Sequence, residues 1–542
     1  MPSEKQILLS DIHLSKDIAE LEDDVRLVWE PPDIYQDVFK DNVWLVYGRK
    51  GSGKSHLVDY LKKDKSNSIA KNSVIIIRPR EDRLFPSVMS AISEVSEDDE
   101  RIVIENVSAT LEFVLISLLM RRCIDINGFL PPGSEREDIY NFLVQNGFHQ
   151  GSILHQAVGV LARIAGGKFK IVDNLSSLLS DNPLTKGFPD AKAALWDCLK
   201  RANSSFIICI DDIDEIGFSF SRSDRLFINA LIVLMLRLNL EFAKEKHPLR
   251  ILMTSPSELF FHSTLWGDDW VETKARCLRW TQHEAIQRIV NKRIGEQLNI
   301  RKNNPRNEYD IYSDATQQTW SSLFPTSITN KLGKQEPALK YLLRHTFYTP
   351  RHVLNLSDKI LHHFGKRKMT VEQAKNISPY DWSVAFQNKT EEYTCNIVNS
   401  FLKLYGKIYD GLDDVLCAFT SKPAVWTRGN ISTFVEREKL TITRRDSQKI
   451  YKGDAILYKL QHLGFLGLGS KDLVSHAMTT AFNVRYAFLE RLPNNRPWEI
   501  AVIAPLFYDS YGIITPDHSI IIPHERLHLS HLAWQEVAQY KP

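Results

Sequence analysis

The chain has 542 residues, a formal net charge of +2, 43% hydrophobic residues and 25% charged residues. This composition is ordinary for a soluble globular protein, and it excludes a wholly disordered chain, a collagen-like fibre and a disulfide scaffold. So small a net charge does not indicate binding to nucleic acid or to a membrane. A surface that binds either must therefore be a local basic patch. The length predicts about three or four domains.

Cysteine spacing and apolar runs indicate a cytoplasmic protein. No two of the six cysteines are closer than 11 residues, so the sequence holds no CxxC zinc or redox pair. Scattered thiols are typical of a reducing compartment. The start, MPSEKQILLS, has no signal-peptide pattern. The longest apolar stretches, Leu115–Met120 and Phe227–Leu236, are far shorter than the roughly 20 residues that span a bilayer. We therefore expect no membrane segment.

Predicted strands alternate with helices in the first half of the chain. A polar, acidic N-terminal segment covers residues 1–42. Continuously apolar runs then predict buried parallel strands, separated by helical periodicity. The predicted strands are Val43–Tyr47, Ser73–Ile77, Phe206–Ile210, Arg250–Met253 and Ala275–Leu278. The sequence therefore predicts an α/β core with a parallel sheet over residues 43–280.

Helical periodicity interrupts this core and also follows it. A helical insertion is expected at about 90–200, where the clearest helices are Asn106–Cys123 and Ile153–Ile164, and where Ser134 and Glu137 have the spacing of a capping box. A long apolar helix is predicted over Arg225–Lys244, before the fourth strand.

A helical lid and a mixed C-terminal region are expected after the core. The lid covers 281–375, with helices over Gln282–Leu298 and Ala338–Phe364. An α+β region follows over 395–542. It includes a helical patch, Ser447–Leu463, and short strands near Tyr486–Leu489 and Ile500–Ile503.

A glycine-rich turn after the first strand has the pattern GxxxxGK[ST]. Glycines let backbone N–H groups approach phosphate oxygens, and the following helix directs its positive end at the anion. Lys54 is expected to contact the β- and γ-phosphates, and Ser55 to bind Mg²⁺ through its hydroxyl. The predicted nucleotide-binding residues are Gly48, Arg49, Lys50, Gly51, Ser52, Gly53, Lys54, Ser55 and His56.

Acidic residues end the third predicted strand. Asp211 and Asp212 directly follow Phe206–Ile210. In a phosphate-loop site, Asp211 would hold Mg²⁺ and Asp212 would orient or deprotonate the attacking water. Glu215, about one turn further on, is the alternative base.

Two further elements are candidate sensors of the γ-phosphate. Thr254 and Ser255 end the fourth strand, and either hydroxyl could position the water. Arg351, after Thr349-Pro350, opens a helix in the lid and could fold over the γ-phosphate. A solvated arginine at a helix start is the alternative for Arg351.

These motifs resemble the AAA+ ATPases of the origin-recognition and STAND branch, and more narrowly a bacterial P-loop ATPase family often found near mobile-element or defence genes. The resemblance rests on GRKGSGKS, IDDID, LRWTQHEAIQRIVNKRI, TPRHVLNL and ILYKLQHLGFLG, and covers about half the chain. It implies ATP and Mg²⁺ as cofactors, a sensor role for Arg351, a winged-helix character for the C-terminal region and a role in anti-phage defence. It also implies DNA, or a protein partner encoded nearby, as the target.

Three departures from that pattern bear on function. The acidic strand ends Asp-Asp rather than Asp-Glu, and a shorter base predicts slow hydrolysis. The separation of Ser55 and Asp211 is long, which indicates the insertion. The glycine that usually precedes the proline of the lid sensor is absent before Pro350. Oligomerisation stays open because three residues compete as the arginine finger, namely Arg222, Arg225 and Arg279.

Two C-terminal features suggest other chemistry. His524, Glu525 and His528 match HExxH, which on a helix can bind zinc. The near candidates for a third ligand, His531 and Glu536, do not lie at a usual spacing, so a terminal amphipathic helix is the favoured interpretation. The basic stretch Arg437–Lys452 could contact DNA phosphates, although a solvated face explains it equally well.

The expected function is therefore an ATPase that couples ATP binding and slow hydrolysis to conformational change, acting on DNA or a partner protein. The alternative is a STAND-like switch, in which nucleotide controls assembly with little turnover. A nucleotide or small-molecule kinase is disfavoured because no acceptor pocket is recognisable.

Overall fold

The structure is a computed structural model, and it describes residues 7–15, 25–39, 43–68, 74–78, 100–125, 130, 132–146, 148, 187–201, 206–213, 220–247, 249–260, 269–298, 319–471, 479–489, 497–516, 519–540 and 542. The chain divides into two compact units. The sheet unit comprises Asp33–Lys50 and Lys54–Leu278. The terminal unit comprises Met1–Pro32, Gly51–Gly53 and Arg279–Pro542, so it contains both ends of the chain and the tip of the glycine-rich loop.

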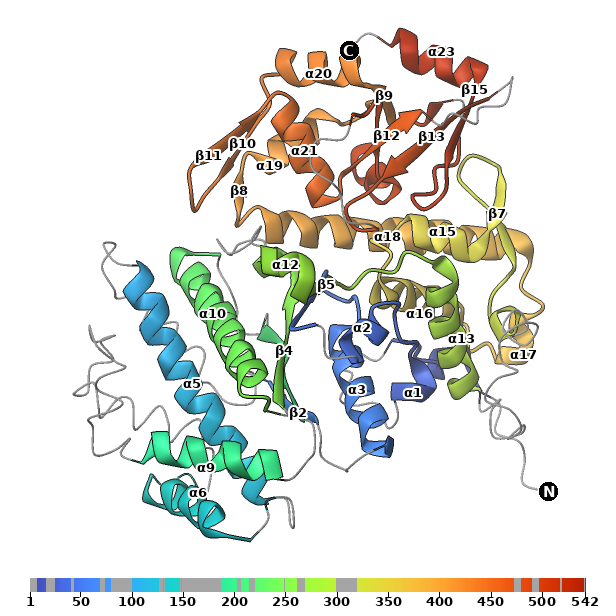
Figure 1. The fold of residues 1–542 in the computed structure, drawn as a ribbon. Helices are drawn as coiled ribbons and strands as arrows, with labels where there is room; N and C mark the ends of the chain where they lie inside the picture. The colour runs from blue at the N-terminus through green and yellow to red at the C-terminus, as the bar shows by residue number, and fades with distance from the viewer. Residues whose placement is uncertain are drawn as a thin grey trace, which may run out of the picture. The chain divides into compact units, whose positions relative to one another are not determined.

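A five-stranded parallel sheet forms the centre of the sheet unit (Figure 1). The strands are β1 (Leu45–Gly48), β2 (Val74–Ile77), β3 (Phe206–Ile210), β4 (Leu249–Pro256) and β5 (Ala275–Cys277), in the order β2-β3-β4-β1-β5. Nearly every strand residue is buried, which is why the sequence reads as continuous apolar runs. The predicted mixed α/β class with a parallel sheet is confirmed.

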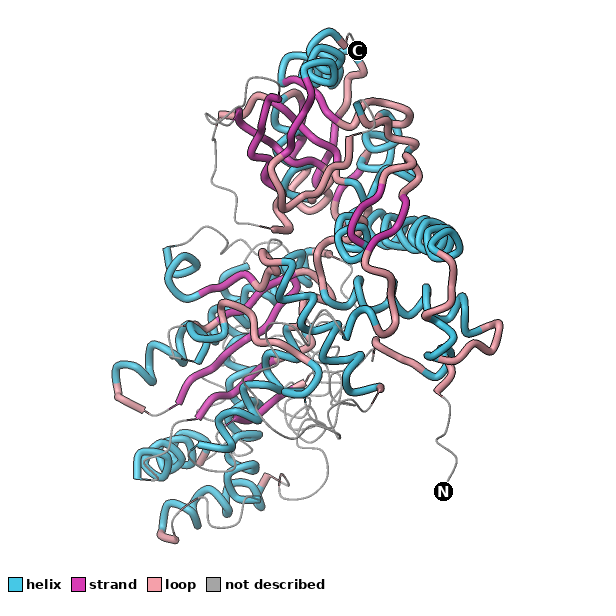
Figure 2. Tube along the Cα trace, turned by 90° about the vertical axis from the view of Figure 1, so that its right-hand side faces the viewer, coloured by secondary structure: helices cyan, strands magenta, loops and turns pink. Residues whose placement is uncertain are grey.

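Helices cover both faces of this sheet. α10 (Arg222–Lys244) lies on one side with α5 (Glu100–Asp125) outside it, and α2 (Tyr35–Phe39) and α3 (Lys54–Ser68) lie on the other (Figures 1 and 2). Ser221 and Asp224 form a capping box that starts α10. The short helices α11 (Ser257–Phe260) and α12 (Asp269–Lys274) follow β4.

The described residues between β2 and β3 are mostly helical. They form α5, α6 (Ser134–Gln145) and α9 (Phe188–Arg201), whereas the predicted helix Ile153–Ile164 lies outside the described residues. The predicted capping box of α6 is wrong. The helix starts at Ser134 itself, so Gly133 is its N-cap, and the Ser134 hydroxyl bonds to the Glu135 carboxylate.

Two described helices, α5 and α10, are long and apolar enough to cross a membrane. In each, 67% of the most apolar 18-residue window is buried inside the fold. Core helices of soluble proteins meet the same criterion, so these helices are weak indications of a membrane segment.

Helices dominate the first part of the terminal unit. The N-terminal residues contribute η1 (Leu9–Asp11) and α1 (Val25–Val28). Further along the chain come α13 (His283–Gln297), the hairpin β6 (Ser327–Thr329) and β7 (Gln335–Pro337), α15 (Ala338–Arg344), α16 (Pro350–Gly365), α17 (Val371–Ala374) and α18 (Pro379–Tyr405). The helical segment predicted over Ala338–Phe364 comprises α15 and α16, and the helix start predicted at Thr349-Pro350-Arg351 is confirmed. Pro350 fits only the first turn of a helix, and Thr349 caps the new start.

Two antiparallel sheets follow in the same unit. The first has the order β11-β10-β8 and packs with α19 (Leu412–Ala418) and α21 (Asp454–Leu463). Its strands are β8 (Tyr409–Asp410), β10 (Thr441–Arg444) and β11 (Lys449–Lys452). The second has the order β15-β13-β12-β14-β9, from β9 (Val425–Thr427), β12 (Leu466–Lys471), β13 (Thr479–Arg485), β14 (Ile500–Ile503) and β15 (Leu527–Ser530). The remaining elements are α20 (Arg428–Arg437), η7 (Pro505–Phe507), α22 (Tyr508–Tyr511) and α23 (His531–Gln539).

Two predictions in this region need correction. Residues 449–452 of the predicted helix Ser447–Leu463 form β11, and Gly453, with φ of 55°, separates that strand from α21. Tyr486–Leu489 is a turn after β13 rather than a strand. The strand at Ile500–Ile503 is confirmed.

Candidate phosphate and metal site

Residues from four segments of the sheet unit meet at the carboxyl ends of its strands. β1 leads into the glycine-rich loop, α3 starts at Lys54, β3 ends before Asp211, and β4 carries Thr254. Because all five strands are parallel, their carboxyl ends share one edge of the sheet, which is where open α/β sheets bind ligands.

Lys54 is turned back along the loop. Lys54 is only 8% exposed, and its Nζ donates hydrogen bonds to the backbone oxygens of Gly48 at 3.1 Å and Arg49 at 3.3 Å. The ammonium therefore lies among loop carbonyls, at the first residue of α3. A cation here and the helix start favour the same ligand, a phosphate.

Asp211 is fully buried and held from two sides. Its backbone N–H donates to the oxygen of Ile77 at 3.0 Å, and its Oδ1 accepts a hydrogen bond from the Thr254 hydroxyl. Burial, together with the nearby charge of Asp212, raises the pKa of Asp211 to about 6. Its Oδ2 has no hydrogen bond among the described residues. This oxygen accepts no hydrogen bond from those residues, and burial disfavours the ionised form of the carboxylate. Both features suit an oxygen ligand of a divalent cation.

The structure shows which hydroxyl at the end of β4 contacts Asp211. Thr254 contacts Asp211, whereas the Ser255 hydroxyl donates to the backbone oxygen of its neighbour, Pro256, at 3.1 Å. Successive side chains on a strand point to opposite faces, so only one of the two can face Asp211. The sequence alone left this choice open.

Asp212 and Ser55 are brought together from positions 157 residues apart in the chain. The Ser55 hydroxyl donates to Asp212 Oδ1 at 3.0 Å. Asp212 has a positive φ of 55°, a backbone conformation that aspartate adopts more readily than most residues. The predicted water-orienting residue therefore lies beside the predicted magnesium ligand. The alternative base, Glu215, lies outside the described residues.

Arg78 and Asp59 also belong to this site, although no sequence motif points to either residue. Arg78 follows β2, and its Nη2 lies 3.1 Å and 3.2 Å from the two carboxylate oxygens of Asp59 on α3. Its Nε lies 3.4 Å from Asp212 and 3.8 Å from Asp211. The only sequence signal was the charged run after β2. Its relevance depends on β2 pairing with β3, which the sequence does not reveal.

The tip of the loop packs within the terminal unit. Gly51 and Gly53 have φ of 82° and 94°, which glycine adopts without strain. The Trp280 indole donates to the backbone oxygen of Ser52 at 2.8 Å. A Cβ on Gly53 would lie 3.0 Å from the Trp29 indole nitrogen, and a Cβ on Gly51 would lie 2.9 Å from the Cβ of Arg351.

Arg351, the predicted lid sensor, therefore lies against the glycine-rich loop. It is the second residue of α16, and its side chain covers Gly51. Trp29 and Trp280 are further residues that the sequence analysis did not single out. Their rings meet edge to face at 6.0 Å.

The contacts of the remaining candidate residues do not assign them a role in this site. Arg222 and Arg225 both pair with Glu100, at 3.0 Å and 2.7 Å. Arg279 is half-buried at the start of the terminal unit's main segment. Lys50 is exposed, and Arg49 and His56 are half-buried. The arginine finger stays unassigned.

The HExxH pattern does not form a metal-binding helix. His524 lies in a turn and His528 on the exposed face of β15, so the expected terminal helix is wrong here and starts only at His531. His524 Nδ1 lies 2.6 Å from the Tyr348 hydroxyl, and burial lowers the pKa of His524 to about 4. Across the described residues, no group of three or more His, Cys, Asp or Glu side chains could hold a metal ion.

Comparison with known proteins finds no matching family model and no matching curated protein.

Proposed function

We propose that this protein is a P-loop ATPase that binds Mg-ATP and hydrolyses it slowly. The observation that carries the proposal is the meeting of Ser55 with Asp212, and of Thr254 with Asp211, at the carboxyl edge of a parallel sheet. Phosphate-loop hydrolysis needs these parts: a lysine and amides for phosphate, a hydroxyl and an aspartate for Mg²⁺, and a carboxylate for water. When bound, Mg²⁺ would neutralise charge that develops on the transferred phosphoryl group.

The chain's own residues then have separable roles. Lys54 would leave the loop carbonyls for phosphate oxygens, and Ser55 would release Asp212 to bind the cation. Thr254 orients Asp211, and its hydrogen bond leaves Oδ2 for the metal or its water. Arg351 would report on nucleotide through its contact with Gly51.

Slow turnover follows from the surroundings of Asp212. One of its oxygens accepts from Ser55, and the other lies 3.4 Å from the Arg78 guanidinium. Both oxygens of the proposed water-orienting carboxylate are therefore already in contact with protein groups, and a water molecule has to displace one of these contacts before hydrolysis. This observation also supports the second candidate, a STAND-like switch that binds nucleotide and controls assembly with little turnover.

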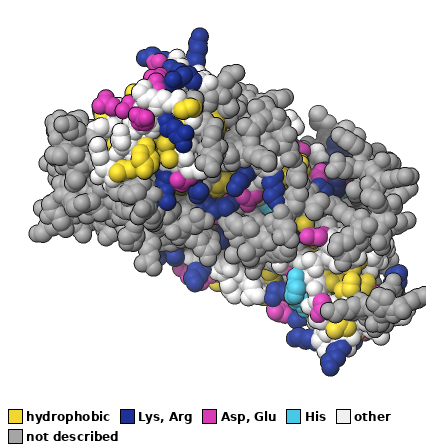
Figure 3. Space-filling view, turned by 90° about the horizontal axis from the view of Figure 1, so that it is seen from below, with side chains coloured by type: hydrophobic (Ala, Val, Ile, Leu, Met, Phe, Trp, Pro, Cys, Tyr) yellow, Lys and Arg dark blue, Asp and Glu magenta, His cyan; other side chains and the backbone are white. Residues whose placement is uncertain are grey.

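The target is proposed to be DNA or a partner protein, bound through the C-terminal region. In this proposal the antiparallel sheet β11-β10-β8, with α19 and α20 between β8 and β10 in the chain, is the winged-helix part, and the β10–β11 hairpin is its wing. Its arginines are paired with acids, Arg444 with Asp446 and Arg445 with Asp410. Figure 3 shows a different face, seen from below Figure 1, where basic and acidic side chains also lie among one another. A partner protein is therefore as suitable as DNA. Cytoplasmic location and a defence role are part of the same proposal.

The chemistry is tested by paired variants in a nucleotide-binding and hydrolysis assay. Lys54→Ala should abolish ATP binding, and Asp212→Ala should keep binding but stop turnover. Thr254→Val should slow turnover roughly 10²-fold, in the range of a lost positioning contact, whereas the adjacent Ser255→Ala should be neutral. Normal hydrolysis by Asp212→Ala would make Glu215 the base, and normal ATP binding by Lys54→Ala would refute the proposal.

The two candidate functions are separated by turnover and assembly. An ATPase rate that rises on adding DNA supports a DNA-directed enzyme. Nucleotide-dependent assembly in mass photometry, without turnover, supports the switch.

A further inference from the structure

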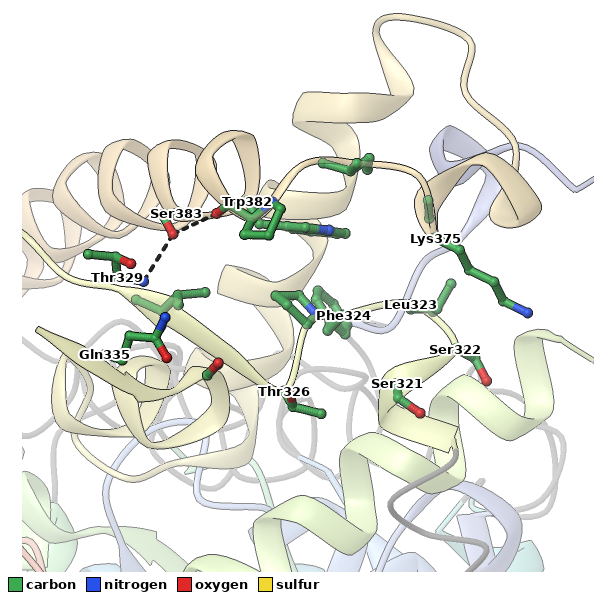
Figure 4. A pocket seen from close by; sticks show the side chains of 16 residues that line it. Ser321, Ser322, Leu323, Phe324, Thr326, Thr329, Gln335, Lys375, Trp382 and Ser383 are labelled. Carbon is green, nitrogen blue, oxygen red and sulfur yellow. Dashed lines mark hydrogen bonds between the residues drawn. The ribbon is translucent and has the colours of Figure 1, made fainter.

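A half-open cavity in the terminal unit has the size of a small-molecule site. Its volume is about 420 Å³, and it lies where the loop before β6, the end of α17 and the start of α18 converge (Figure 4). That volume falls in the range of ligand pockets, roughly 300–1,000 Å³. None of its lining residues belongs to the phosphate and metal site.

The floor of the cavity is aromatic and rigid. Phe324 and Trp382 are 3% and 5% exposed, and their ring centroids lie 6.2 Å apart. Trp320 stacks beneath Phe324 at 4.5 Å, and its indole donates to the backbone oxygen of Pro325 at 2.9 Å. Phe364 supports Trp382 from the other side at 4.7 Å. The neighbouring rings therefore hold these two side chains in place, and the two rings, tilted 50° to each other, each leave a small part of their surface for a ligand.

The polar groups of the cavity have one sign of charge. Lys375 extends from the rim, and no aspartate or glutamate lines the cavity. Among the described residues Lys375 has no ion pair. The Trp382 indole N–H makes no hydrogen bond with another described residue, and Thr326 and Gln335 add a hydroxyl and an amide to the lining. These groups favour a ligand with an anionic group and hydrogen-bond acceptors.

An extended peptide fits this cavity poorly. A peptide that adds to a sheet edge needs a row of backbone groups on the edge strand. The strand at this cavity, β6, offers few free backbone groups, because the preceding Pro325 has no N–H and both backbone groups of Thr329 already make hydrogen bonds. Its N–H donates to Ser383 Oγ at 3.0 Å, and its oxygen accepts from Gln387 at 2.8 Å.

We propose that this cavity binds a small aromatic anion, a planar ring on the Trp382–Phe324 floor with its negative group at Lys375. The site is separate from the ATP site and does not depend on its assignment. The ring supplies burial of apolar surface, and the anion supplies orientation and selectivity. Trp382 in turn packs on Phe364 of α16, the helix that carries Arg351.

The test is a calorimetric titration of the full chain with 1-naphthyl phosphate. 1-Naphthol, which lacks the charge, and inorganic phosphate, which lacks the ring, are the matched probes. We expect naphthyl phosphate to bind at least about fivefold more tightly than either. Lys375→Ala should weaken it about fivefold, and Ser327→Trp, at the exposed rim, should abolish it. Lys366→Ala, an exposed lysine outside the cavity, should leave it unchanged.

The titration is repeated with Lys54→Ala, since a phosphate could also occupy the glycine-rich loop. Binding that persists in Lys54→Ala supports the cavity, and binding lost there overturns the proposal. An absence of binding to wild type, or equal binding by Lys375→Ala and correctly folded Ser327→Trp, overturns it as well. These outcomes leave the ATPase assignment untouched, because none depends on nucleotide turnover.

Discussion

Arg78 offers a quantitative test of the site geometry, through the substitution Arg78→Met. Methionine keeps much of the apolar stem but removes the guanidinium, which leaves Asp59, Asp211 and Asp212 without their shared cation. The side chains of Arg78 and Asp59 are 11% and 16% exposed. Removing one partner of a fully buried pair costs about 3–5 kcal/mol, and an exposed pair contributes about 0–1 kcal/mol.

For this largely buried cluster we expect a loss of about 2–3 kcal/mol in the free energy of unfolding, or about 4–12 °C in the transition of the sheet unit by scanning calorimetry. Arg276→Met is the matched control. Arg276 pairs with Asp37 at 2.9 Å in the same unit, but the two side chains are 29% and 52% exposed, so its loss should stay below about 1 kcal/mol. Equal shifts for the two variants would refute the argument that burial of the Arg78 cluster sets its strength.

Magnesium provides a second readout of the same variant. The guanidinium repels a divalent cation from Asp211 and Asp212, so adding Mg²⁺ without nucleotide should stabilise Arg78→Met more than wild type. A purely structural role for Arg78 predicts the same Mg²⁺ effect in both proteins.

Two further predictions concern the loop and the acid stability of the terminal unit. Gly51→Ala should lower the affinity for ATP and also the free energy of unfolding, the latter by about 1–2 kcal/mol from the positive φ alone and by more from the clash with Arg351. The control is Gly429→Ala, where a Cβ meets nothing within 4 Å, and this variant should be neutral or stabilising in thermal melts. His524 has a folded pKa of about 4, below its unfolded value, so its contribution is fully present above about pH 6.5 and is lost as the pH falls toward 4. In melts across this range His524→Gln should lose less stability than wild type, by roughly 2 kcal/mol after allowance for solvent screening, whereas the exposed His528→Gln should follow wild type. Identical pH profiles for both histidine variants would contradict the assigned burial of His524.

Local patterns in the sequence predicted much of the sheet unit. The apolar runs located all five strands, since a strand covered on both faces must be apolar throughout. The glycine, lysine and serine spacing and the acids after β3 indicated two segments that the structure brings together through Ser55 and Asp212. Each of these signals lies within a few residues of chain, where backbone conformation and side-chain burial leave a direct imprint.

Only the tertiary structure decided which distant residues share a site. The order β2-β3-β4-β1-β5 brings Arg78 to Asp212 and selects Thr254 over Ser255, because strand neighbours and side-chain facing depend on pairing between segments far apart in the chain. The same holds for HExxH. Its spacing suits a helix, yet pairing with β13 makes residues 527–530 a strand. Local spacing specifies which groups are available, and long-range packing determines which of them meet.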